Sequence, residues 1–207
     1  MLGIIQAAGW PIWPLLACSI VAMALIFERL YSLQTKLVIP DRLLDEVLSL
    51  SQPELLNPNS ISQLKNHCAL GEIVVAGLLH RQHKPSTSES DFRAVVEASG
   101  RRVNHKLEKY LSALGSIASI APLLGLFGTV VGMIEIFGSQ TPGTGNPAQL
   151  AHGISVALYN TAFGLVIAIP SLVMWRHFRN RVDYFTVELE IAAERFVRHF
   201  YAASKGK

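Results

Sequence analysis

Apolar and charged residues are segregated along this chain of 207 residues. Residues 2–27 carry no charge, and residues 110–175 contain no Lys, Arg or Asp, with Glu135 as their one acid. A helix needs roughly 20 apolar residues to cross the hydrocarbon core of a bilayer. The first stretch therefore predicts one membrane helix over residues 10–30, and the second stretch is long enough for two.

A cluster of turn-forming residues interrupts the second apolar stretch. The sequence SQTPGTGNPAQ at residues 139–149 is rich in Gly, Pro and small polar residues and has no apolar repeat. We expect a hairpin of two membrane helices, over residues 112–137 and 150–175, joined by a turn at 138–149. The pattern thus predicts an all-α membrane protein with three transmembrane helices.

The basic residues predict how these helices are oriented. All 18 Lys and Arg residues lie outside the apolar stretches, eleven from Arg29 to Lys109 and seven from Arg176 to Lys207. Basic residues near the ends of membrane helices stay on the cytoplasmic side. We therefore expect residues 1–9 and the 138–149 turn outside, and residues 31–111 and the tail 176–207 in the cytoplasm. The same rule accounts for the pI near 9.0, so nucleic acid is not an expected partner.

Helical periodicity continues into the charged segments. Ser90 and Asp91 are N-cap candidates for a helix whose apolar positions recur at helical spacing up to the second membrane helix. No strong stop signal intervenes, so we expect one long helix that rises from the cytoplasm into the membrane. Gly100, Gly115 and Pro122 are the positions at which it could bend.

The tail carries a second apolar stripe, with spacings that alternate between four and three residues. A helix from residue 150 to about residue 200 is predicted, on the order of 75 Å long, because no Gly or Pro occurs between Ser171 and Ser204. Its stripe needs a partner, either the helix that starts near Asp91 or a neighbouring subunit. The stripe consists of Phe178, Val182, Phe185, Leu189, Ala192 and Phe196.

The rest of the cytoplasmic segment offers little chemistry. Short helices are expected over residues 41–50 and 61–80, followed by the linker KPSTSES. His80 and His83 are three residues apart, a spacing that can hold a metal, but no further ligand shares their register. Cys18 and Cys68 show no CxxC spacing. We expect packing roles for both cysteines, no metal site and no cofactor.

Small residues form a stripe on each of the last two predicted membrane helices. Small side chains let membrane helices approach closely, so we expect both stripes to lie in helix-to-helix contacts. The second helix carries Ala118, Ala121, Gly125, Gly128, Thr129 and Gly132, and the third carries Gly153, Ala157, Thr161, Gly164 and Ala168.

Polar side chains within the two helices are the candidate proton-path residues. Thr129 and Thr161 are expected at nearly the same depth, near the bilayer midplane, with Asn160 beside Thr161. Either these hydroxyls line a proton path, or each bonds back to its own i−4 carbonyl. Glu135, near the outer end, is either a solvated rim residue or the entrance to an ion path. Near the midplane no group can hold a proton, so another chain must supply the acid if protons cross here.

The segment LGSIASIAPLLGLFGTVVGMIEIF, followed after the turn by HGISVALYNTAFGLVIAIPSLVMW, resembles the ExbB/TolQ/MotA family of proton-channel subunits. FERLYSL, at the end of the first helix, supports the resemblance, which is closest to the ExbB and TolQ branches. It implies a homopentamer in the bacterial inner membrane around a single-span ExbD- or TolR-like partner, whose aspartate carries the proton. It also implies that Thr129 and Thr161 line the pore. Many relatives read GIAEAL where this chain reads GISVAL, so Val156 replaces their glutamate.

The resemblance implies an energy transducer and not an enzyme. An ExbB-like subunit would pass the work to a TonB-like periplasmic protein for energised import through the outer membrane, for example of iron-siderophores. A TolQ-like subunit would instead maintain the envelope. A scaffold that uses the small-residue stripes only to assemble a complex is the alternative from another class. An enzyme is not expected because no nucleophile and base pair is evident, and GLFGTVVG lies within a predicted membrane helix.

Overall fold

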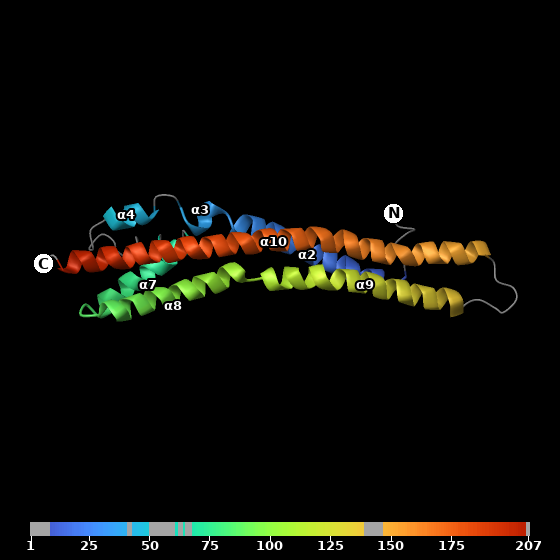
Figure 1. Cartoon of the computed structure of the whole chain (residues 1–207), viewed down its shortest axis with the longest axis horizontal. Helices are drawn as coiled ribbons and strands as arrows, with labels where there is room; N and C mark the ends of the chain where they lie inside the picture. The colour runs from blue at the N-terminus through green and yellow to red at the C-terminus, as the bar shows by residue number, and fades with distance from the viewer. Residues whose placement is uncertain are drawn as a thin grey trace. The chain divides into compact units, whose positions relative to one another are not determined.

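The computed structural model describes residues 9–40, 43–49, 61, 64, 68–138 and 147–205, and these residues form helices and their connections, without a strand among them (Figure 1). They divide into two compact units. The apolar unit comprises Met1–Arg29 and Tyr110–His177, and the polar unit comprises Leu30–Lys109 and Phe178–Lys207. The division follows the segregation of charge along the sequence.

Three helical stretches are long and apolar enough to cross a membrane. They are α2 (Ile12–Ser32), the stretch formed by α8 (Glu89–Glu108) and α9 (Leu111–Gly138), and α10 (Pro147–Lys205). In the second and third stretches the apolar part lies in the apolar unit. The prediction of three apolar spans in an all-helical chain is thus confirmed over the described residues.

The apolar unit has a small core shared by its three helices. Leu15 of α2, Ala121 of α9 and Ala168 of α10 are buried together, and Leu124 and Ile167 pack against them. Two of the three buried residues are alanines, which agrees with the close packing that small side chains allow between membrane helices. Large apolar side chains elsewhere on these helices are exposed, as suits surfaces that face lipid or other subunits.

The polar unit is built on the second part of α10. It also contains α3 (Thr35–Val38), α4 (Leu43–Ser49), α7 (Ala69–His83) and α8. All six residues of the predicted tail stripe are buried. Phe196 of that stripe lies 5.8 Å from Phe92 of α8 between ring centroids, and a Cβ at Gly77 of α7 would come within 2.8 Å of Phe196. The stripe therefore finds partners within its own chain, in α7 and α8.

The starts of α7 and α8 are fixed by side-chain caps that the sequence did not single out. The Sγ atom of Cys68 accepts a hydrogen bond of 3.2 Å from the main-chain N–H of Gly71, and burial raises the pKa of this thiol. Ser88, and not the predicted Ser90 or Asp91, caps α8, because its hydroxyl accepts from the N–H of Asp91 at 3.1 Å. The expected N-cap was therefore two to three residues too late.

The expectation of one continuous helix through the second span is wrong at residues 109 and 110. Lys109 has ψ 137°, and Tyr110 adopts a left-handed φ of 66°, so α8 ends and α9 begins anew. The ring of Tyr110 lies under the guanidinium of Arg29, 5.4 Å from its centroid. This cation–π contact offsets part of the backbone strain. In contrast, the helical assignment continues through the predicted bend positions Gly100, Gly115 and Pro122.

Other helix boundaries differ from those predicted by a few residues. Helix α10 begins at Pro147, inside the predicted turn, and ends at Lys205. Proline favours the first turn of a helix, and the prediction of a turn at 138–149 did not take this preference into account. Helix α4 occupies the middle of the predicted 41–50 helix. Within the predicted 61–80 run, residues 61 and 64 are helical, and α7 begins at Ala69 after its N-cap at Cys68. Residues 41, 42, 50–60, 62, 63, 65–67 and 139–146 lie outside the described residues.

Candidate functional site

Helices α9 and α10 approach closely because glycines of each face the main chain of the other. A Cβ added at Gly125 would lie 2.8 Å from the carbonyl oxygen of Asn160 and 3.0 Å from the Cα of Thr161. A Cβ at Gly164 would lie 2.6 Å from the carbonyl oxygen of Ala121. Main-chain atoms cannot move aside as a side-chain tip can, so these positions require glycine. The two predicted small-residue stripes therefore pack against each other.

The stripes extend the contact toward the start of α10. A Cβ at Gly132 would meet the methyl group of Ala157 at 3.0 Å, and one at Gly153 would meet Ile136 at 2.7 Å. At the other end Ala168 is buried in the three-helix core. The structure thus brings the predicted packing residues together along most of the apolar part of the helix pair.

This close approach brings Thr129 and Thr161 together. Their Oγ1 atoms are 3.4 Å apart, although 32 residues separate them in sequence. The hydroxyl of Thr129 donates to the carbonyl of Leu126 at 2.6 Å, and that of Thr161 donates across the helix pair to the carbonyl of Gly125 at 3.2 Å. Both threonines are half-buried. The result is a small polar cluster inside an otherwise apolar helix pair.

Nearby serines follow a different pattern. Ser119, Ser155 and Ser171 each donate to the carbonyl four residues earlier in their own helix, at 2.7 to 3.0 Å. This is the ordinary way in which a membrane helix satisfies a hydroxyl. Thr129 bonds to its own helix in a similar way, at i−3, whereas Thr161 bonds to α9. The alternative that each threonine only bonds back to its own helix therefore does not hold for Thr161.

Asn160 and Glu135 occupy different surroundings from the threonines. Asn160 is 1% exposed, and a Cβ at Gly128 would lie 2.8 Å from its Cβ and 3.0 Å from its Nδ2, so Asn160 lies within the contact between the helices. Glu135 is exposed and six residues beyond Thr129, which is about 9 Å along the helix axis. Val156, one turn before Asn160, is half-buried. The structure does not bring Glu135 into the hydroxyl pair.

Two contributions to this unit were not found from the sequence. Thr161 donates to the main-chain carbonyl of Gly125, and a main-chain acceptor cannot be recognised from residue types. Gly125 itself lies on the predicted small-residue stripe. Gly115, expected as a bend, faces the ring of Trp175, whose Nε1 would lie 2.9 Å from an added Cβ. Both are contacts between helices, and only the pairing of the two stripes could have suggested them.

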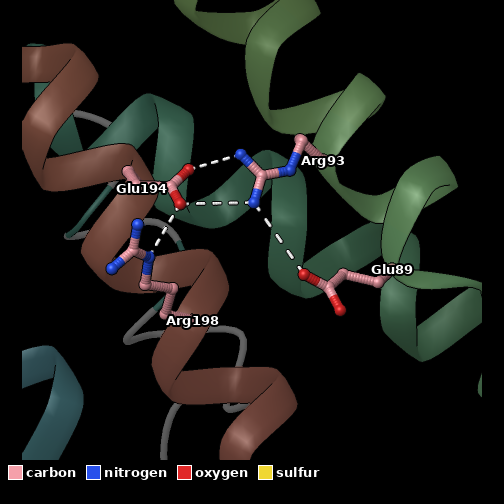
Figure 2. Close-up of polar contacts among 4 residues, drawn as sticks. All are labelled: Glu89, Arg93, Glu194 and Arg198. Carbon is pink, nitrogen blue, oxygen red and sulfur yellow. Dashed lines mark hydrogen bonds and ion pairs between the residues drawn. The ribbon is translucent and has the colours of Figure 1, made fainter.

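The polar unit has its own charged cluster, which links α8 to α10 (Figure 2). The Arg93 guanidinium lies between the carboxylates of Glu194 and Glu89, and Glu194 also accepts from Arg198 at 2.8 Å. The hydrogen bond from Arg93 lowers the pKa of Glu194, and the same bond raises the pKa of Arg93. The cluster borders a groove of about 840 Å³ between the two helices.

The histidine pair does not gain further ligands. Nε2 of His80 lies 3.4 Å from the hydroxyl of Thr87. Within the described residues, no group of three or more His, Cys, Asp or Glu side chains is placed to hold a metal ion. The hydroxyl pair in the apolar unit therefore remains the stronger candidate site.

Comparison with known proteins identifies relatives that include this helix pair. Residues 65–191 match the model of the MotA/TolQ/ExbB proton channel family. The biopolymer transport protein exbB1 of Vibrio cholerae is 36% identical over 172 residues, which cover 81% of this chain and 74% of that protein. ExbB of Salmonella typhimurium is 34% identical over 118 residues, covering 53% of this chain and 48% of that protein.

A Tol-system relative is also similar. The Tol-Pal system protein TolQ of Pseudomonas aeruginosa is 40% identical over 83 residues, covering 40% of this chain and 36% of that protein. The family match takes in all of α7, α8 and α9 and most of α10, including both threonines. With its three apolar helical spans, this chain belongs to the MotA/TolQ/ExbB proton channel family.

Proposed function

We propose that this chain is the channel subunit of a proton-driven motor in the bacterial inner membrane and that it delivers work to a TonB-like periplasmic protein. The observation that carries the proposal is the hydroxyl pair of Thr129 and Thr161, held 3.4 Å apart where α9 and α10 meet. Family membership supports the proton-channel function, and the ExbB-named relatives support the ExbB-like role.

The proton carrier in this proposal belongs to another chain. Residues 110–175 hold one acid, Glu135, and it is exposed toward the end of α9 and outside the hydroxyl pair. A single-span partner of the ExbD or TolR type would place its carboxyl beside the hydroxyls. Hydroxyl groups suit that position because they can bond either form of a carboxyl group without carrying charge themselves. Glu135 would then contribute at the outer rim of the path, and Asn160 would hold the two helices in register.

The assembly follows from the same proposal. Five copies would surround the partner helices, with the N-terminus outside and the polar unit in the cytoplasm, where the positive-inside rule directs the basic residues. Each charge moved across the membrane supplies about 2.3 kcal/mol per 100 mV, so a few protons can drive a conformational step. The exposed apolar side chains of α2, α9 and α10 leave surfaces for lipid, partner helices and neighbouring copies.

Replacement of Thr161 by valine tests the proposed function. Valine keeps the shape of threonine and removes the hydroxyl, so Thr161→Val is expected to abolish proton flux and receptor-dependent iron uptake while the complex still assembles. Thr161→Ser is the matched control, because it keeps the hydroxyl, and it should retain most of the flux. Normal growth of the valine variant on receptor-dependent iron would refute the role assigned to Thr161.

The similarity to TolQ supports a second function of the same kind, namely envelope maintenance. Both functions use proton flow, so flux does not separate them. Deletion of the gene does: loss of receptor-dependent import with an intact envelope identifies the ExbB-like role, and detergent sensitivity with normal import identifies the TolQ-like role. Liposomes that contain the subunit and its partner but conduct no protons would leave only the scaffold function.

A further inference from the structure

The hydrogen atoms of the two threonine hydroxyls are already donated to acceptors within the helix pair itself. A hydroxyl has one hydrogen to donate and two lone pairs that accept. Thr129 donates to the Leu126 carbonyl at 2.6 Å, so its hydrogen is taken. Thr161 can donate to the Gly125 carbonyl at 3.2 Å or to the Thr129 hydroxyl at 3.4 Å. In either arrangement both hydrogens are donated to groups of α9.

The outer side of Thr129 opens on an apolar hollow. This hollow on the surface of α9 has a volume of about 480 Å³, and Thr129 supplies its one polar side chain. Its other lining residues are Val130, Met133, Ile134 and Phe137. A polar group that enters the hollow therefore meets lone pairs of a hydroxyl oxygen and not a hydrogen. Such a surface can accept a hydrogen bond but cannot readily donate one.

We propose that the Thr129–Thr161 pair binds the neutral, protonated form of a carboxylic acid in preference to its carboxylate. This inference rests on the proposed function, in which a partner helix brings a carboxyl group to the pair. The acid O–H donates to a threonine oxygen, and no atom is transferred in that contact. A carboxylate at the same place would need a donor, so Thr161 would have to turn its hydrogen away from the Gly125 carbonyl. The acid is therefore held protonated at the pair and gives up its proton after it leaves.

Gly125 is the positioning residue of this arrangement. Its carbonyl accepts from Thr161, and its missing side chain lets α10 come close enough for that bond. A Cβ there would lie 2.8 Å from the Asn160 carbonyl oxygen and 3.0 Å from the Thr161 Cα, so Gly125→Ala must push α10 away. The Thr161 hydrogen would then be released and could donate to a carboxylate. Gly138 is the matched control in the same helix, because a Cβ there meets nothing within 4 Å.

The test uses the complex with its single-span partner, reconstituted in liposomes. A carbodiimide reacts with protonated carboxyl groups, so the pH at which labelling of the partner acid falls to half reports its protonation at the site. Thr161→Val should lower this midpoint by about half to one pH unit, since the neutral acid loses an acceptor. Gly125→Ala should lower it as well, because a donor for the carboxylate is released. Thr161→Ser and Gly138→Ala should leave it unchanged.

The direction in which the labelling midpoint shifts shows which form of the acid the hydroxyls bind. A midpoint that rises in Thr161→Val would show that the hydroxyls donate to a carboxylate, and a midpoint that does not move would show that they do not bond the acid. Either result overturns this inference while proton flux through the native complex would still support the proposed function. If the native complex carries no flux, the proposed function and the inference fall together. The valine and serine variants keep the test decisive even where Gly125→Ala fails to assemble.

Discussion

At the residue scale, the site depends on glycines, because a residue without a side chain lets the two helices approach closely. Gly125 and Gly164 face main-chain atoms across the helix pair, and the hydroxyl contact between Thr129 and Thr161 exists only because α9 and α10 approach to that distance. Van der Waals packing provides most of the attraction between membrane helices, since lipid tails are as apolar as the helices themselves. Glycine at these positions therefore serves both assembly and the placement of the two hydroxyls.

Gly164→Ala is expected to weaken the helix pair. The added Cβ would lie 2.6 Å from the Ala121 carbonyl oxygen and 3.1 Å from the Gly125 Cα, so the helices must separate. Overpacking of this kind typically costs about 1–3 kcal/mol. Thermal unfolding of the complex in detergent should show a lower midpoint for Gly164→Ala and almost no change for Gly138→Ala. Equal midpoints for the two variants would contradict the close approach described here.

The Arg93–Glu194 pair gives the polar unit a predictable pH dependence. The pKa of Glu194 is lower in the folded chain than its ordinary value, so its ion pair stabilises the fold above about pH 4.3 and is lost as the pH falls below that value. Glu194→Gln should therefore be slightly less stable than the native chain at pH 7, and the difference should vanish on acidification. Both side chains are partly exposed to solvent, so the effect is small and salt weakens it.

A matched substitution distinguishes the effect of breaking the Arg93–Glu194 pair from the effect of removing one negative charge. Glu97 contacts Arg101 at 3.8 Å, a looser ion pair between more exposed side chains. Glu97→Gln should leave the thermal midpoint at pH 7 nearly unchanged. If Glu194→Gln and Glu97→Gln behave alike at pH 7 and on acidification, the link between α8 and α10 contributes nothing specific to stability.

At the element scale, the break between α8 and α9 shows what periodicity cannot reveal. Apolar positions continue at helical spacing through Leu107, Leu111 and Leu114, all of which are buried, so the sequence predicts one helix. The interruption falls on Tyr110, which carries no Gly or Pro signal and adopts φ 66°. Its contact with Arg29 is between residues 81 positions apart, and single-sequence reasoning has no access to it.

Substitutions at Tyr110 distinguish the backbone strain of its left-handed conformation from the contact of its ring with Arg29. Tyr110→Ala removes the ring and keeps a side chain at a left-handed φ, whereas Tyr110→Gly removes both. The glycine variant should therefore be more stable than the alanine variant by about 1 kcal/mol, although glycine normally weakens helical segments. Thermal or denaturant unfolding in detergent measures the difference. An alanine variant that equals or exceeds the glycine variant would show that residue 110 is not held in the left-handed conformation.

At the scale of the whole molecule, the sequence was most informative where one physical rule dominated. The two apolar stretches, residues 2–27 and 110–175, predicted three apolar helical spans. The small-residue stripes pointed to contacts between helices, and the structure places Gly125 and Gly164 at such a contact. The sequence was least informative where contacts between residues far apart in the chain determine the structure. The cross-helix bond from Thr161 to the Gly125 carbonyl depends on how the two helices are paired, and no local pattern encodes that pairing.

The orientation proposed for the whole chain rests on the positive-inside rule, and it can be measured directly. Cysteine accessibility first requires that Cys18 and Cys68 be replaced. Cys68→Ser is the suitable choice because its hydroxyl can accept the Gly71 N–H bond that caps α7. A new cysteine at Ala148, exposed near the start of α10, should react with a membrane-impermeant maleimide added outside the cytoplasmic membrane.

A cysteine at Ser90, exposed in the polar unit, is the matched partner of the Ala148 position. It should react with the same reagent only after the membrane is permeabilised, if the eleven basic residues from Arg29 to Lys109 lie in the cytoplasm as proposed. The reverse pattern would place the polar unit outside. That result would contradict the topology proposed for the chain, with its polar unit in the cytoplasm.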